Sequence, residues 1–322
     1  MKLLITVPWD AEQMQRIQQA FPGVDFITAL SEEKVLQSVE DVEVVFGDLT
    51  RKGFLAAKNL RWVQCHGAGV NNLVAIPELV KSDVLVTNTR GAHAPTIAEH
   101  LIGTLIALTR KLPDLYLAQV RKEWINWSEW STKIGARPVG LFGMTMGVIG
   151  LGNIGRAVAE RAAAFQMKII AVDICDVPRP PYLAELWKLE NLPRLLQQSD
   201  VVVVTIPGTP ETNGLLGKGA LSLMKPSAYL CVVSRGGIVD EEALASMLTE
   251  GRLAGAAVDV FKKEPLPADS PLWSAPNLVL TPHVCGKSEN TTAAATSIFI
   301  ENLQRYLDRQ PLNNLVNKEM GF

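Results

Sequence analysis

Short runs of β-branched residues alternate with helical patterns along almost the whole chain, and this alternation limits the fold more than any other feature. Five such runs come first: LLITV, VDFIT, VEVVFG, WVQCHG and VLVTNT. A long helical pattern over residues 96–111 and an irregular stretch over 122–143 follow. Six more runs come next: MGVIGLG, KIIAVD, DVVVVTIP, AYLCVVS, LAGAAVDV and NLVLTPH. Strands that alternate with helices imply parallel sheets covered by helices on both faces. We therefore expect an α/β protein with two doubly wound parallel-sheet domains.

The last helical pattern, residues 288–309, lies beyond the second series. Six strands complete a dinucleotide-binding sheet, so the simplest packing returns this helix to the first domain. The predicted domains are therefore residues 1–98 plus 288–322, and residues 99–287. Two crossings between them, near residues 93–100 and 284–290, would form a hinge over a cleft.

Charge and hydropathy exclude several classes of partner. The 322 residues carry a net charge of −2 without a block of like charge, which gives no electrostatic reason to expect nucleic acid or an anionic membrane. The longest apolar stretch, Leu101–Leu108, is broken by Gly103 and is far shorter than the roughly 18 residues of a membrane span. The N-terminal MKLLITVPWD is typical of a first strand and lacks a signal-peptide cleavage site. We expect a soluble, cytoplasmic protein.

The four cysteines give no sign of a metal or disulfide framework. Cys65, Cys175, Cys231 and Cys285 form no CxxC pair. No metal ligand is therefore predicted.

A glycine motif lies between a strand and a helix at the start of the second series. Residues 148–156 read VIGLGNIGR, so Gly150, Gly152 and Gly155 complete G-x-G-x-x-G. In this context the first glycine makes a tight turn, the second lets a pyrophosphate approach the backbone, and the third lets the helix pack on its strand. The alternative is a glycine-rich turn that binds nothing.

An acidic residue ends the next strand, KIIAVD. The carboxylate of Asp173 would accept hydrogen bonds from the ribose hydroxyls and repel a 2′-phosphate, which favours NAD over NADP. Arg179 and the competing acid Asp176 follow closely, so NADP stays open.

Three residues after successive strands suit the oxidation of a 2-hydroxy acid. His283 can take the hydroxyl proton, because histidine titrates near neutrality. Arg235 can hold the carboxylate through its two-pronged guanidinium. Glu264 can orient the histidine and favour its charged form. Each alone is weak evidence, because arginine and glutamate at sheet edges are often ordinary surface residues.

The other histidines are weaker candidates. His66 and His93 lie in loops near strand ends and could line the cleft, whereas His100, inside the long helix, is typical of a packed helix residue.

Several motifs along the chain together resemble one family. They are GAGVNNL, AEHLIGTLIAL, GVIGLGNIGRAVA, PGTPETNGLL, SRGGIVDEEAL, GAAVDVFKKEPLP, SPLW and NLVLTPHVCG. Their order and separations are similar to those of the D-isomer-specific 2-hydroxyacid dehydrogenases, including glyoxylate/hydroxypyruvate reductases and phosphoglycerate dehydrogenases. The resemblance implies a Rossmann domain that binds NAD and a discontinuous, flavodoxin-like substrate domain. It also implies a homodimer formed through the cofactor domain.

The resemblance assigns roles to individual residues. It makes His283 the acid/base, Glu264 its carboxylate partner and Arg235 a ligand of the substrate carboxylate and carbonyl, and it adds the backbone at Ala68 and Gly69 as a further carboxylate site. The dinucleotide would lie against the glycine turn and Asp173, together with Thr96, Asn153, Ile154, Ile206, Pro207, Thr212, Val233, Ser234, Asp259 and His283.

Departures from the family pattern leave alternatives open. Val232 replaces a common asparagine, and Cys285 replaces a small residue, which raises a Cys–His nucleophilic pair as an alternative. Formate or phosphite oxidation and a non-catalytic, NAD-sensing corepressor share this fold. A phosphorylated substrate would need basic residues such as Arg90 or Lys287.

A cluster of tryptophans in the irregular stretch has no assigned role. Trp124, Trp127 and Trp130 are consistent with a lid over the cleft, but also with a dimer contact or a small core of the loop itself.

Overall fold

The computed structural model describes residues 1–321, which form two α/β units. One unit comprises Met1–His93 together with the chain from Ser288 onward, and the other comprises Ala94–Lys287. The chain passes from one unit to the other at 93/94 and at 287/288, and the predicted boundaries are 98/99 and 287/288. The roles assigned to the two units remain predictions.

The first unit is built on a five-stranded parallel sheet with the order β2-β1-β3-β4-β5. This is the flavodoxin-like order expected of the unit. Each of the five β-branched runs overlaps one strand. The strands are β1 (Lys2–Ile5), β2 (Asp25–Thr28), β3 (Val44–Phe46), β4 (Trp62–Gln64) and β5 (Leu85–Thr87).

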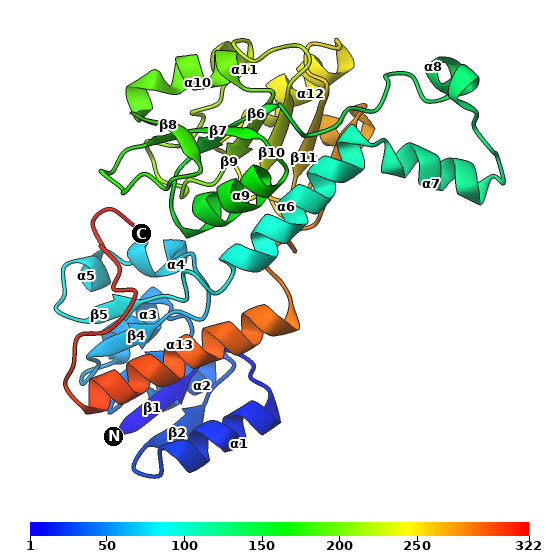
Figure 1. Ribbon diagram of the computed structural model, residues 1–322. Coiled ribbons are helices and arrows are strands. Elements are labelled where there is room, and N and C mark those ends of the chain that lie inside the picture. Colours follow the sequence, from blue (N-terminus) through cyan, green and yellow to red (C-terminus); the bar gives the residue numbers. More distant parts are fainter. Residues whose placement is uncertain (322) are drawn as a thin grey trace. The chain divides into compact units, whose positions relative to one another are not determined.

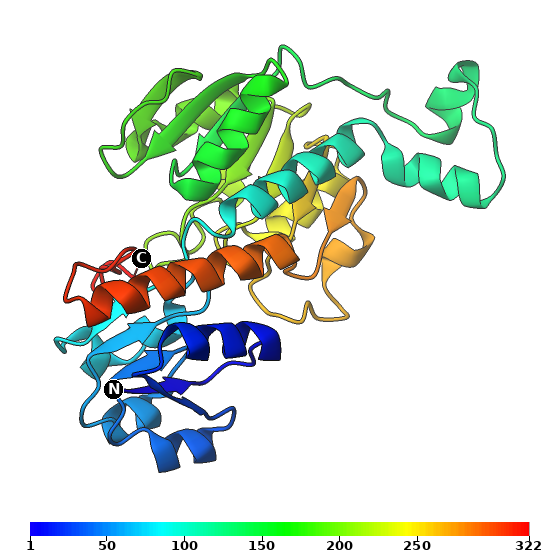
Figure 2. The ribbon, with the colours of Figure 1, turned by 60° about the horizontal axis from the view of Figure 1, so that its bottom comes forward.

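Helices cover both faces of this sheet (Figures 1 and 2). On one face α1 (Ala11–Ala20) and α13 (Glu289–Leu307) bury Ile17, Phe299 and Leu303 against the strands. The side chains of alternate strand residues point to the opposite face. That face carries α2 (Glu32–Ser38), α3 (Arg51–Ala56), α4 (Asn71–Val74) and α5 (Pro77–Val80).

The second unit is built on a seven-stranded parallel sheet with the order β12-β11-β10-β9-β6-β7-β8. The order reverses between β6 and β9, which is the switch point where open α/β sheets bind ligands. The six expected strands are present, but the expectation of six strands in all is wrong because β8 adds an edge strand beyond β7. The strands are β6 (Thr145–Ile149), β7 (Lys168–Asp173), β8 (Leu183–Lys188), β9 (Val201–Val204), β10 (Tyr229–Val232), β11 (Gly255–Val258) and β12 (Leu278–Leu280).

This sheet is also covered on both faces. One core lies under α6 (Ala94–Thr109) and α9 (Asn153–Ala164). The other lies under α10 (Leu192–Gln198), α11 (Lys218–Leu221) and α12 (Glu241–Thr249). Single turns of 3₁₀ helix are present at η2 (Leu189–Asn191) and η3 (Pro271–Ser274).

An arm leaves α6 and returns to β6 (Figure 1). It contains α7 (Leu112–Val120), η1 (Trp127–Glu129) and α8 (Trp130–Lys133), so the stretch expected to be irregular is partly helical. Trp127 packs on Trp130 with ring centroids 5.5 Å apart, whereas Trp124 is 87% exposed. Trp130 is buried but Trp127 is 59% exposed, so the role of the three tryptophans stays open.

Within residues 1–321, none of the helices is both long and apolar enough to cross a membrane.

Candidate active site

The glycine turn between β6 and α9 has the geometry that a dinucleotide requires. Gly150 has φ +92°, which favours glycine, and a Cβ on Gly155 would lie only 2.0 Å from the Gly150 carbonyl oxygen. A Cβ built on Gly152, by contrast, meets no heavy atom of the described residues within 4 Å. The first and third glycines thus hold the turn against the helix, and the second leaves the backbone open to a ligand.

Asp173, at the end of β7, is fixed beside this turn. Its Oδ2 accepts a hydrogen bond of 2.6 Å from the Leu151 N–H, and its Oδ1 accepts one of 2.8 Å from the Cys175 N–H. The guanidinium of Arg179 donates to the Leu183 carbonyl of β8 at 2.9 Å. The carboxylate therefore lies next to the glycine turn, while the nearby arginine bonds the backbone of the edge strand.

A buried hydroxyl group lies just after the end of β10. Ser234, 5% exposed, follows β10, and its Oγ is buried without a hydrogen-bond partner among the described residues. Such a group normally bonds to something, so an additional polar group there would satisfy it. Together with the open glycine turn, this observation fits a nicotinamide dinucleotide.

Two further features belong to the same region. The first-turn N–H groups of α9, including those of Asn153 and Ile154, have no acceptor within the helix and attract anions. Thr212 holds the loop after β9, because its Oγ1 donates to the Pro207 carbonyl at 2.8 Å and accepts from the Thr209 N–H at 2.8 Å.

A histidine–carboxylate pair lies at the ends of β11 and β12. His283 Nδ1 is 2.7 Å from Glu264 Oε2, and Glu264 Oε1 accepts a hydrogen bond of 2.9 Å from the Phe261 N–H. The side chains of His283 and Glu264 are 47% and 35% exposed. The carboxylate is thus oriented by the backbone, and with Nδ1 engaged it is Nε2 of His283 that can exchange a proton with a substrate.

Asp259 anchors the loop that carries His283. Its buried carboxylate accepts hydrogen bonds from the Thr281 hydroxyl at 2.5 Å and from the N–H groups of Val284 and Cys285 at 3.0 Å each. Burial alone would raise the pKa of Asp259, but the hydrogen bonds from Cys285, Thr281 and Val284 outweigh burial and lower it. The carboxylate therefore stays charged.

His100 and Thr281 extend this anchor, and the sequence did not single out either of them for this role. His100 Nε2 is 3.1 Å from Thr281 Oγ1 and 4.0 Å from Asp259 Oδ1. The long helix α6 thereby contacts the anchor of the histidine loop. Two sequence positions could have identified them: His100 comes four residues after Thr96, and Thr281 comes two residues before His283.

Arg235 lies in the turn that follows β10. Its Nη1 donates to the Ser234 carbonyl at 2.7 Å. A Cβ on the following Gly236 would lie 1.9 Å from the Phe261 carbonyl oxygen. The arginine turn therefore packs directly on the segment that orients Glu264.

A pocket of 760 Å³ opens beside the histidine–carboxylate pair. Two polar groups lie at its wall. One is the exposed Lys287, a predicted candidate for binding a phosphorylated substrate, and the other is Trp273, to which the sequence analysis assigned no role. The lining is mostly apolar: Phe261, Glu264, Pro265, Leu266, Trp273, Leu280, Thr281, Pro282, His283 and Lys287.

Other predicted residues have different surroundings. Thr96 lies in the first turn of α6, Ile206 contacts the glycine turn, and Val233 is buried after β10. Ala68 and Gly69 belong to the other unit, as do His66, His93 and Arg90, whose Nη2 donates to the Leu315 carbonyl at 3.3 Å. It remains a prediction that Ala68 and Gly69 bind the same carboxylate as Arg235 and that His66 and His93 line the cleft.

The two departures from the family pattern are both buried. Val232 is 2% exposed and belongs to the apolar core. Burial, and then the Asp259 carboxylate, raise the pKa of the Cys285 thiol, which is 3% exposed. A thiolate nucleophile is therefore disfavoured there.

The fold and this edge define a dinucleotide-binding α/β protein with a histidine–carboxylate pair. The model of the family described as D-isomer specific 2-hydroxyacid dehydrogenase, NAD binding domain, matches residues 102–285. A glyoxylate reductase of Korarchaeum cryptofilum is 34% identical over 301 residues, which are 90% of this chain and 87% of that protein. The chain belongs to the D-isomer specific 2-hydroxyacid dehydrogenase family.

Two further relatives extend the comparison. A D-3-phosphoglycerate dehydrogenase of Methanocaldococcus jannaschii is 31% identical over 98% of this chain, but the chain spans only 59% of its length. The crystal structure of a D-isomer specific 2-hydroxyacid dehydrogenase from Xanthobacter autotrophicus, in complex with NADPH and MES, is 30% identical with a TM-score of 0.83, covering 100% of this chain and 99% of that one. The family match supports a nicotinamide dinucleotide as cofactor.

Proposed function

We propose that the protein transfers a hydride between NAD(H) and a small D-2-hydroxy acid or its 2-keto acid. The observation that carries this proposal is the 2.7 Å contact of His283 Nδ1 with Glu264 Oε2, at the same sheet edge as the dinucleotide turn. Family membership supports the reaction class.

His283 is the proposed acid/base. In the reductive direction protonated His283 donates its Nε2 proton to the substrate carbonyl oxygen, and in the oxidative direction Nε2 accepts the hydroxyl proton. Glu264 holds the ring in this orientation and stabilises the imidazolium. The nicotinamide, when bound, supplies or accepts the hydride.

Arg235 is the proposed substrate ligand. Its guanidinium holds the substrate carboxylate through two N–H groups and offsets the negative charge that develops on the carbonyl oxygen. The backbone N–H groups at Ala68 and Gly69 of the first unit are proposed as further ligands of the same carboxylate.

NAD is the proposed cofactor in preference to NADP. In this proposal the Asp173 carboxylate, held by the Leu151 and Cys175 amides, accepts hydrogen bonds from the ribose hydroxyls and repels a 2′-phosphate. The neighbouring Lys188 forms an ion pair of 2.5 Å with Asp176, which partly neutralises the cation that a 2′-phosphate would use.

The direct test is oxidation of NADH and NADPH by the purified protein against glyoxylate, hydroxypyruvate, pyruvate and phenylpyruvate. We expect turnover with NADH, its loss in His283→Ala and in Arg235→Ala, and NADH binding close to wild type in both variants. Wild-type turnover in His283→Ala would exclude the proposed proton transfer. Turnover with NADPH alone would exclude the proposed role of Asp173.

We also propose that the protein is a homodimer, formed through the cofactor unit. The arm exposes apolar side chains that are costly to leave in water, among them Tyr116 at 63%, Leu117 at 52% and Val120 at 62%. Sedimentation should give twice the 35.1 kDa chain mass, and Leu117→Glu should shift it toward the monomer. A monomeric wild-type protein would exclude the dimer.

A further inference from the structure

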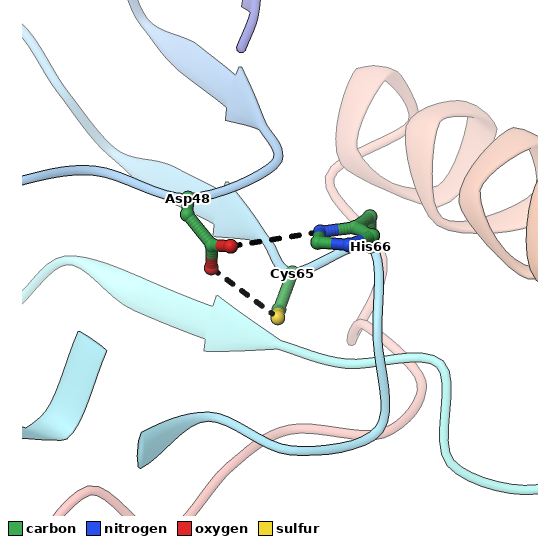
Figure 3. Close-up of side chains that lie close together, drawn as sticks. All are labelled: Asp48, Cys65 and His66. Carbon is green, nitrogen blue, oxygen red and sulfur yellow. Dashed lines mark hydrogen bonds and ion pairs between the residues drawn. The ribbon is translucent and has the colours of Figure 1, made fainter. Parts of the chain in front are cut away.

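We propose that Asp48, Cys65 and His66 of the first unit form a binding site for a zinc-like divalent metal ion. All three residues belong to the first unit, and the proposed metal site does not depend on the proposed function. Figure 3 shows the three side chains converging at the ends of two strands.

The topology explains how these residues meet. Asp48 follows β3, and Cys65 and His66 follow β4, which pairs with β3 in parallel. The carboxyl ends of adjacent parallel strands lie at the same sheet edge, so residues far apart in sequence become neighbours. The spacing carries no CxxC or similar signature, which is why the sequence predicts no metal.

The distances suit three ligands of one ion. Cys65 Sγ lies 3.8 Å from Asp48 Oδ1, and His66 Nδ1 lies 3.7 Å from Asp48 Oδ2. The three ligand atoms are all within 4.8 Å of one another. Tetrahedral zinc, with Zn–S about 2.3 Å and Zn–N and Zn–O about 2.1 Å, separates S from O by about 3.6 Å and N from O by about 3.4 Å. The two separations run to different oxygens of Asp48, whereas one ligand atom from each residue lies within 4.8 Å of the others. The side chains must therefore move closer by up to about 1 Å to bind one ion.

Three threonines hold the backbone of the ligands in place. The Thr6 hydroxyl donates to the Asp48 carbonyl at 2.8 Å, the Thr89 hydroxyl donates to the His66 carbonyl at 3.1 Å, and the Cys65 N–H donates to the Thr87 carbonyl at 2.8 Å. Ligands on such a fixed backbone lose little conformational freedom when an ion binds.

The exposure of the ligands provides an entry path. Cys65 is 2% exposed, whereas the side chains of His66 and Asp48 are 49% and 39% exposed. An ion can thus enter from the histidine side and reach the buried sulfur. Thiolate with imidazole selects zinc-like ions over magnesium or calcium. Three protein ligands leave a fourth position for water or an anion.

Metal binding changes the adjacent loop. The Cys65 thiol now donates to the Gly69 carbonyl at 3.3 Å. On binding, the thiol releases its proton to solvent and the sulfur bonds the ion, so this hydrogen bond is lost. Gly69 is a predicted ligand of the substrate carboxylate. Because this loop loses a hydrogen bond when the ion binds, zinc should lower turnover, and this consequence does rest on the proposed function.

The test uses Co²⁺ as a spectroscopic probe on the full chain after treatment with a chelator. We expect one Co²⁺ per chain with a thiolate-to-cobalt charge-transfer band, and displacement of that band by Zn²⁺. Cys65→Ser should abolish the band. His66→Ala, at an exposed position that does not threaten the fold, should weaken Co²⁺ binding at least about tenfold, because even indirect partners of metal ligands contribute that much.

Cys175→Ser is the matched control, because it removes the exposed cysteine of the other unit and should leave the band unchanged. A wild-type protein without the band, or a band that persists in Cys65→Ser, would overturn the metal site. Zinc that displaces cobalt without lowering turnover would overturn only the coupling to Gly69. The absorption band is independent of turnover, so failure of the metal site and failure of the proposed function are distinguishable.

Discussion

Replacing Gly152 by alanine separates ligand approach from protein packing. A Cβ at this position meets no heavy atom of the described chain within 4 Å, and the backbone φ of −75° suits any residue. Losing glycine at a helix N-cap costs up to about 1 kcal/mol, and the stiffer unfolded chain returns about 0.4–1 kcal/mol. The free energy of unfolding should therefore change by less than about 1 kcal/mol.

The same methyl group stands where the pyrophosphate of a dinucleotide would approach the backbone. We expect Gly152→Ala to weaken NADH binding at least tenfold, or about 1.4 kcal/mol. Titration of NADH fluorescence measures the affinity, and urea unfolding of the same samples measures stability.

Gly155→Ala is the contrasting variant. Its Cβ would lie 2.0 Å from the Gly150 carbonyl oxygen, so the turn or the helix must shift, and overpacking of this kind costs about 1–3 kcal/mol. Gly152→Ala that binds NADH like the wild type would show that no phosphate lies against this glycine. Equal destabilisation by both variants would show that the space around Gly152 is not open.

Three further changes test other parts of the structure. Asp259→Asn removes a charged hydrogen-bond acceptor and leaves a buried N–H unsatisfied, so the free energy of unfolding in urea should fall by about 3 kcal/mol at pH 7. Because the folded pKa of Asp259 is lowered, its contribution is present above the unfolded pKa of about 3.9 and is lost as pH falls through the folded value, so the two proteins should converge in acid; a gap independent of pH would contradict this. Asp173→Asn should reduce the ratio of kcat/KM with NADH to kcat/KM with NADPH roughly fivefold, because one like-charge contact is worth about 1 kcal/mol. An unchanged ratio would exclude a role of Asp173 in cofactor choice. Lys318→Met removes donors to the carbonyls of Leu79 and Val84, and should lower the stability of the first unit by about 2 kcal/mol in urea while NADH affinity stays constant.

The sequence predicts elements whose pattern is local. The buried strands are runs of β-branched residues, and the glycine turn lies directly between strand and helix, so both are visible without knowledge of the fold. The edge strand β8 was missed because LAELWK contains no β-branched side chain and does not alternate polar and apolar residues. Its pairing with β7 depends on a neighbour, which no local pattern reveals.

The candidate site divides in the same way. His283, Glu264 and Arg235 each follow a predicted strand, so their placement at one edge could be expected. The contacts of Asp259 with Thr281 and His100, and those of Asp48 with Cys65 and His66, join residues on different elements. Such contacts depend on the strand order of the sheet and on side-chain direction, and the spacing of residues along the chain predicts neither.

Transfer of deuterium from the C4 position of labelled NADH to the product tests hydride transfer most directly. The wild-type protein should place deuterium on C2 of the hydroxy acid formed from at least one 2-keto acid, and His283→Ala should form no labelled product while still binding NADH. Wild-type protein that binds NADH but labels no product from any 2-keto acid would contradict a dehydrogenase acting on 2-hydroxy acids.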